Sequence, residues 1–179
     1  MELSQGYPFS LAMLKKCRTL YEQAGLVTSW AEPSEDAPFH SLLVRFDKVG
    51  GRESSVTMEL CFLPYLEEAA SEGVYLLQTF ITITENIFSA AAAELLKIVA
   101  KINTQLPVGA YGFFEDTGVV YFKYNIIINE SAGEEAIIKT INQQSGLILH
   151  QIYLFIDAIL DVAEGIKPAA EAWQSAPLL

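Results

Sequence analysis

The stretch from Ala90 to Ile128 constrains the fold most, because it holds one helix pattern, a break and one hairpin pattern in direct succession. The helix is predicted from four apolar residues spaced four, three and four positions apart: Leu95, Val99, Ile102 and Leu106. That spacing places them on one face of an α-helix. Pro107 cannot continue the helix and Gly109 relaxes the backbone beyond it, so the helix ends there.

A hairpin of two aromatic strands follows this break. Its turn is predicted at Glu115–Gly118, because aspartate caps a turn locally and glycine accepts a positive φ angle. The second strand alternates two largely apolar faces, one of which carries Val120 and Phe122 and the other Val119 and Tyr121. A solvated antiparallel strand alternates more cleanly, so we expect something to cover each side of the sheet.

The rest of the chain predicts an α+β fold with a five-stranded antiparallel sheet, in the element order α-β-β-β-α-β-β-α. A first helix follows Ser10, and a short strand could begin at residues 27–30 before an acidic, proline-containing loop. Strands at 42–46 and 56–62 form a hairpin around Gly50 and Gly51, for which we favour a bulged loop that aligns the apolar residues. The remaining predicted segments are an acidic turn or loop at 64–73, a third strand at 74–83 and a final helix at 133–164.

Length predicts one domain over residues 1–165, since two domains in 179 residues would each have a thin core. Residues 166–179 contain two prolines and are expected to form a frayed tail. Apolar residues make up 51% of the chain and charged residues 18%, against about 25% in typical soluble domains. Monomers seldom expose large apolar patches, so this composition favours a homodimer.

The chain carries 11 basic and 22 acidic residues, a net charge of −11. That charge repels phosphate backbones, which argues against nucleic-acid binding. It suits a basic or amphipathic protein partner, and it also suits solubility alone. The two cysteines, Cys17 and Cys61, lack metal-ligand spacing and no export signal precedes them, so we expect a cytoplasmic protein. No window reaches the about 18 uninterrupted apolar residues of a membrane span.

Few residues can support catalysis or metal binding, so we predict no catalytic, cofactor or metal residues. Only His40 and His150 carry imidazoles, and no cluster of metal ligands appears. Three acidic residues share one face of the final helix at i, i+4 and i+7: Asp157, Asp161 and Glu164. Their repulsion could serve a basic partner, although a solvated helix face is the commoner explanation.

Aromatic residues give the best candidate for a binding surface, because tyrosine in particular combines an apolar ring with a polar tip that suits interfaces. The candidate partner-binding residues are Tyr75, Tyr111, Phe113 and Phe114.

Five residues of residues 95–128 form a recognisable pattern: Asn103, Pro107, Gly109, Asp116 and Gly118. With the element order, this pattern resembles the YbjN-like family and the type III secretion chaperone-like fold that the family shares. The resemblance implies a homodimer joined through the middle helix, a surface that accepts an extended protein segment, and a regulatory role. The dimer interface would then include Leu95, Val99, Ile102 and Tyr121. The final helix has the widest apolar surface, so the dimer seam could lie there instead.

The predicted function is therefore a non-catalytic protein-binding module, a YbjN-like regulator that acts as a homodimer and binds a protein segment. One alternative is a type III secretion-type chaperone for an effector protein. Another is a small enzyme with an unrecognised pocket.

Overall fold

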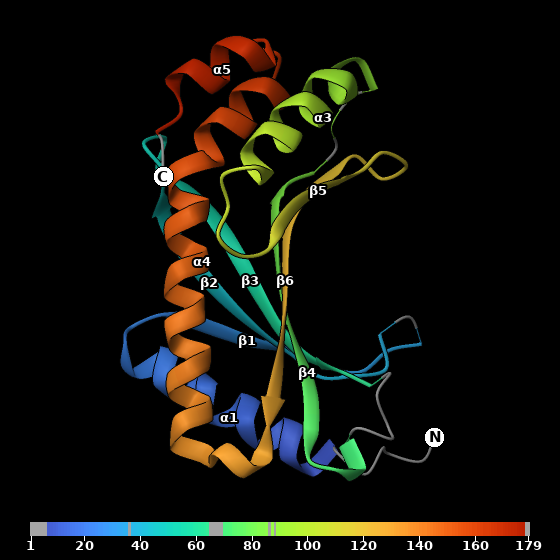
Figure 1. Ribbon diagram of the computed structural model, residues 1–179, viewed down its shortest axis with the longest axis vertical. Coiled ribbons are helices and arrows are strands. Elements are labelled where there is room, and N and C mark those ends of the chain that lie inside the picture. Colours follow the sequence, from blue (N-terminus) through green and yellow to red (C-terminus); the bar gives the residue numbers. More distant parts are fainter. Residues whose placement is uncertain (1–6, 36, 65–69, 86, 88, 178–179) are drawn as a thin grey trace. The chain divides into compact units, whose positions relative to one another are not determined.

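The computed structural model contains one antiparallel sheet of six strands, in the order β1-β2-β3-β4-β6-β5, with helices at both ends of the chain (Figure 1). It describes residues 7–35, 37–64, 70–85, 87 and 89–177. Residues 65–69 of the predicted acidic segment, and residues 1–6, lie outside the described residues. The α+β class is confirmed, whereas the predicted count of five strands is wrong by one.

The elements follow one another as α1 (Tyr7–Gln23), β1 (Val27–Ala31), β2 (Ser41–Val49), β3 (Ser54–Leu63), β4 (Val74–Thr84), α3 (Ser89–Asn103), β5 (Ala110–Phe114), β6 (Val119–Asn129), the 3-10 helix η1 (Glu130–Ala132), α4 (Glu134–Ala163) and α5 (Ala169–Ser175). The predicted final helix, residues 133–164, corresponds to α4, and the predicted hairpin corresponds to β5 and β6.

The additional strand is β1, at one edge of the sheet. Its residues pair antiparallel with β2, from Val27 opposite Arg45 to Ala31 opposite Ser41. The guanidinium of Arg18, on α1, lies 5.7 Å from the centre of the Trp30 ring and so supports the strand through a cation–π contact. Five residues beside an acidic loop give little local signal, and the strand owes its stability to these partners.

The β2–β3 hairpin turns through residues 50–53 and not through the two glycines alone. Lys48 and Glu53 both adopt positive φ angles, 60° and 53°. Val44 and Val49 are both buried. They are five positions apart and would lie on opposite faces of a regular strand, so the alternation of faces shifts by one residue between them. Such a shift is what an inserted residue produces, and it fits the predicted bulged loop.

The chain divides into two compact units, each assembled from three segments. Unit 1 comprises residues 1–46, 57–79 and 125–146, and unit 2 comprises residues 47–56, 80–124 and 147–179. In unit 1 the hydroxyl groups of Tyr21, on α1, and Ser145, on α4, hydrogen-bond at 2.9 Å. In unit 2, α3 packs on both β5 and α5. The single domain over residues 1–165 stays a prediction.

The segment that we expected to fray contains the helix α5, which lies beside α3 (Figure 1). Its alanines Ala169 and Ala172 are buried. The carboxylate of Glu94, on α3, accepts a hydrogen bond of 2.8 Å from the backbone N–H of Ala169. This bond satisfies one of the N–H groups that have no partner within the first turn of a helix, and it holds α5 against α3.

One described helix, α4, is long and apolar enough to cross a membrane by length and composition alone. Of its most apolar window, 56% is buried inside the protein. A helix in the core of a folded domain meets the same criterion, because it too must be apolar around most of its circumference.

Candidate protein-binding surface

The β5–β6 hairpin brings a glycine and a tyrosine directly opposite each other. Gly112 pairs with Tyr121, and Phe114 pairs with Val119 on the same face of the sheet. A Cβ atom on residue 112 would lie 2.3 Å from Cζ of Tyr121. The tyrosine ring therefore lies across the strand over the glycine, a position that only a residue without a side chain leaves free.

Three rings from three neighbouring strands form a continuous stack, which we call the aromatic row: Phe80 on β4, Tyr121 on β6 and Phe114 on β5. The centres of the Phe80 and Tyr121 rings are 5.0 Å apart with 18° between their planes. Those of Phe114 and Tyr121 are 4.3 Å apart with 26° between planes. Phe80 and Tyr121 are half-buried and Phe114 is 47% exposed.

The stacking determines what the aromatic row can bind. Because both faces of the Tyr121 ring are covered by its neighbours, the middle of the row presents ring edges and not flat faces. Tyr121 therefore offers no free ring face on which a nucleobase or a sugar could stack. The end rings, Phe80 and Phe114, each have a neighbour in the row on one face alone. Phe80 is half-buried and Phe114 is exposed, so Phe114 is the ring of the row that is more open to a partner.

The face of β6 that carries Tyr121 has exposed side chains among the described residues. On β6 the alternate side chains Lys123, Asn125 and Ile127 are exposed, Ile127 at 73%. The opposite side chains Val120 and Phe122 are fully buried. The expectation that something covers both faces of this strand therefore stays a prediction, since the exposed side chain of Ile127 leaves apolar surface for a partner on one face.

The four residues predicted to bind a partner differ in exposure. Phe114 is exposed, Phe113 is half-buried, and Tyr75 and Tyr111 are buried. In unit 1, the Tyr75 ring stacks on Phe9 at 4.3 Å. In unit 2, burial raises the pKa of Tyr111 far above its ordinary value. These two tyrosines therefore belong to the cores of their units, and the exposed surface consists of Phe114 and its neighbours in the row.

The helix residues predicted at the dimer interface lie in the core of the chain. Leu95, Val99 and Ile102 are buried, on a helix that packs on β5. They offer no open area to a second copy, because the chain already covers them. Tyr121, the fourth predicted residue, is the central ring of the aromatic row.

The final helix does expose apolar side chains, at the positions that follow residue 146. Leu147 is 39% exposed and Tyr153 is 51% exposed. His150 between them is exposed, and Leu154 is half-buried. These four residues, the α4 patch, share one side of the helix: His150 follows Leu147 by three positions, and Tyr153 and Leu154 follow His150 by three and four.

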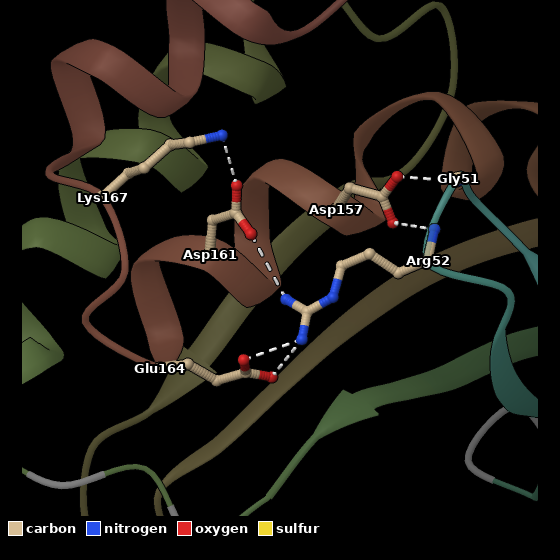
Figure 2. A network of polar contacts seen from close by, with 6 residues as sticks. All are labelled: Gly51, Arg52, Asp157, Asp161, Glu164 and Lys167. Atoms are coloured by element: carbon tan, nitrogen blue, oxygen red, sulfur yellow. Dashed lines mark hydrogen bonds and ion pairs between the residues drawn. The ribbon is translucent and has the colours of Figure 1, made fainter.

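The acidic residues at the end of α4 are bound by other parts of unit 2 (Figure 2). The carboxylate of Asp157 accepts hydrogen bonds from the backbone N–H groups of Gly51, at 2.6 Å, and Arg52, at 3.3 Å. Such charge-assisted bonds anchor the β2–β3 turn to the helix.

The guanidinium of Arg52 neutralises the remaining carboxylates together with Lys167. It donates to Glu164 at 2.7 Å and to Asp161 at 3.3 Å, and Lys167 donates to Asp161 at 2.7 Å (Figure 2). The hydrogen bond to Glu164 is the largest influence that raises the pKa of Arg52. The acidic face of α4 therefore forms ion pairs within unit 2 that are partly exposed, and its binding to a basic partner stays a prediction. The sequence pattern did not single out Arg52.

The surroundings of His40 bear on the alternative of a small enzyme. His40 Nε2 lies 2.8 Å from Glu32 Oε2, so one histidine does meet a carboxylate. The adjacent Ser41, however, donates its hydroxyl to Glu59. Among the described residues, no group of three or more histidine, cysteine, aspartate or glutamate side chains could hold a metal ion.

Comparison with known proteins gives one similar structure. No protein-family model matches the chain. No curated protein matches it either. Among solved structures, the chain is similar to the crystal structure of YbjN, a proposed transcription regulator from E. coli, at 14% identity and a TM-score of 0.42, over 78% of this chain and 88% of that one. The resemblance of residues 95–128 predicts the same family. A likeness of this degree carries no argument about activity.

Proposed function

We propose that the protein is a non-catalytic protein-binding module whose aromatic row receives a segment of another protein. The observation that carries this proposal is the half-exposed stack of Phe80, Tyr121 and Phe114, which ends in the open ring of Phe114. Apolar area of this kind on a sheet face is costly to leave in water, and covering it favours association.

The partner segment is apolar and basic. The chain carries a net charge of −11, which attracts cationic segments and steers their approach. The exposed side chains of Glu115 and Asp116 directly follow Phe114 in the sequence. An arginine or lysine placed on the open face of Phe114 gains a cation–π contact, and these carboxylates are near enough in the chain to support it.

The proposal includes a homodimer joined through the α4 patch. The competing interface on α3 has its apolar residues in the core, whereas Leu147 and Tyr153 on α4 remain exposed. Tyrosine and leucine at the centre of a two-fold contact would meet their own copies, as an isologous interface requires.

The binding proposal is tested with two short fluorescein-labelled peptides, one alternating arginine with leucine and one alternating glutamate with leucine. Fluorescence anisotropy should show binding of the basic peptide alone, weakened by added salt. Phe114→Ala should reduce the affinity about fivefold, the value of a cation–π contact near 1 kcal/mol. Ile127→Ala is the matched control, because it removes an exposed apolar side chain of β6 outside the row. Equal binding of both peptides, or no effect of Phe114→Ala, would refute the proposal.

The dimer proposal is tested by light scattering during size-exclusion chromatography. Tyr153→Asp should convert a dimer into a monomer, because the charge would be buried without a partner in the interface. The control is Leu96→Asp on α3, which is also an exposed apolar position. A wild-type monomer at all concentrations contradicts the dimer without affecting the peptide experiment.

A further inference from the structure

The side chain of Asn103, the last residue of α3, makes a two-point contact with the backbone of β5. Its Oδ1 atom accepts a hydrogen bond of 2.8 Å from the N–H of Tyr111. Its Nδ2 atom donates one of 2.9 Å to the carbonyl oxygen of Tyr111. A carboxamide presents one acceptor and one donor, as a residue of a neighbouring strand does. Asn103 therefore occupies the place that a strand would take beside Tyr111.

The strand order makes this contact an edge contact. β5 is the last strand of the sheet and pairs with β6 on its inner side. In an antiparallel pair the N–H and C=O groups of one residue point to the same side, and the side alternates along the strand. Since the groups of Tyr111 are bound by Asn103, those of Phe113 point to the same outer side. The groups of Gly112 and Phe114 then point toward β6.

The edge that Asn103 covers has the composition of a strand that self-associates. Residues 110–114 read Ala-Tyr-Gly-Phe-Phe, with neither charge nor proline. Edge strands of natural proteins are usually protected by charges, proline, bulges or a cover, because an open edge pairs with another chain. Among the described residues, the side chain of Asn103 bonds to this edge, and the packing of α3 on β5 holds it in place.

We propose that Asn103 closes the β5 edge and that the chain it excludes is β5 of a second copy. Two β5 strands could meet antiparallel around a two-fold axis. The outward N–H and C=O groups of Tyr111 and Phe113 on each strand would then hydrogen-bond to the other strand. Identical strands suit such an isologous contact because each presents the same donors and acceptors. The inference concerns the strand edge, so it is independent of peptide binding on the aromatic row.

The experiment opens the edge by substitution and measures mass. Asn103→Ala removes both bonds to Tyr111, and light scattering over a range of concentrations should show species of at least twice the wild-type mass, since every copy then carries an open edge. Thr104→Ala is the control, because its hydroxyl bonds to Lys101 on α3 and not to β5. Thr104→Ala should keep the wild-type mass.

A second substitution identifies the surface through which Asn103→Ala associates. Phe113→Pro removes an outward N–H group without removing a bond to β6. The double variant that combines it with Asn103→Ala should therefore return to the wild-type mass. Hydrogen exchange should show the Phe113 amide protected in Asn103→Ala and unprotected in the wild type. Association of the double variant would overturn the proposal, as would a folded Asn103→Ala variant of wild-type mass. If Asn103→Ala does not fold, Asn103→Ser decides, since its uncharged side chain is too short to bond both backbone groups of Tyr111, and it too must associate.

Discussion

The phenol ring of Tyr121 lies over Gly112, so close that a Cβ atom at residue 112 would lie 2.3 Å from the ring. The ring cannot move aside without leaving its stack between Phe80 and Phe114. The glycine is thus a condition for the aromatic row and not merely a flexible position.

The first prediction concerns this glycine. Gly112→Ala should lower the free energy of unfolding by about 1–3 kcal/mol, the usual cost of overpacking. It should also weaken binding of the basic peptide, because the stack that supports Phe114 is displaced. Urea unfolding measures the first effect. Gly146→Ala is the control: nothing lies within 4 Å of its added Cβ, and in a helix the change should stabilise by roughly 0.5–1 kcal/mol. Equal stability of wild type and Gly112→Ala would contradict the prediction.

The second prediction ranks two carboxylates of α4. Asp157→Ala should cost about 1–3 kcal/mol, because it leaves the N–H groups of Gly51 and Arg52 without their acceptor. Glu164→Ala should cost about 1 kcal/mol or less, since its bond to Arg52 is a partly exposed ion pair. Both are measured by urea unfolding at low and high salt. The small effect of Glu164→Ala should fade in 1 M salt. The reverse ranking would contradict the prediction. It would show that the bond from the Arg52 guanidinium to Glu164 stabilises α4 more than the bonds from the β2–β3 turn to Asp157 do.

The third prediction concerns stability at alkaline pH. Burial raises the pKa of Cys17 from 9.0 to about 12. It likewise raises the pKa of Tyr21 from 10.0 to about 12. Above pH 9 the unfolded chain loses these protons while the folded chain keeps them, so the free energy of unfolding should fall as pH rises toward 12. The slope is up to about 1.4 kcal/mol per pH unit for each group.

The measurement is the urea midpoint between pH 8 and pH 11. Cys17→Ala lowers stability at every pH by leaving a small void, but its slope above pH 9 should be shallower than that of the wild type. A midpoint that is constant over this range would show that neither group stays protonated in the fold.

The fourth prediction concerns the N-terminus of α5. The pKa of Glu94, on α3, lies below its ordinary value. The hydrogen bond from Lys97 is the largest cause and the one from the Ala169 N–H the next, and both favour the ionised carboxylate. Glu94→Ala should speed hydrogen exchange at residues 169–172, because the first turn of α5 loses an acceptor. Glu94→Gln keeps an oxygen there and should have a smaller effect. Glu115→Ala, which removes an exposed carboxylate elsewhere, should leave the exchange of α5 unchanged.

The elements with strong local patterns could be predicted from sequence. α4 and the β5–β6 hairpin match their expected ranges because side-chain periodicity and turn residues specify them directly. The strand β1 and the helix α5 are short, and contacts with distant residues stabilise both: Arg45 pairs with β1, and Glu94 holds α5. No local pattern reports such contacts.

The sites were harder to predict than the elements. The spacing of Leu95, Val99 and Ile102 shows that they share an apolar face, but not that the same chain covers it. The spacing of Asp161 and Glu164 shows a shared face too, yet their cation, Arg52, is more than a hundred positions away in the sequence. Periodicity identifies the face of a helix and leaves open which part of the chain packs against it.

Both units draw on the start, the middle and the later part of the polypeptide, and this arrangement affects how the protein folds during synthesis. The ribosome must synthesise the chain up to residue 146 before every segment of unit 1 is present. Unit 2 is complete only when residues 147–179 have followed. The strand β4 therefore waits for its neighbour β6, which is synthesised only after α3 and β5. A nascent chain of this kind depends on late, long-range pairing, which slows folding and prolongs its exposure to aggregation and to chaperones.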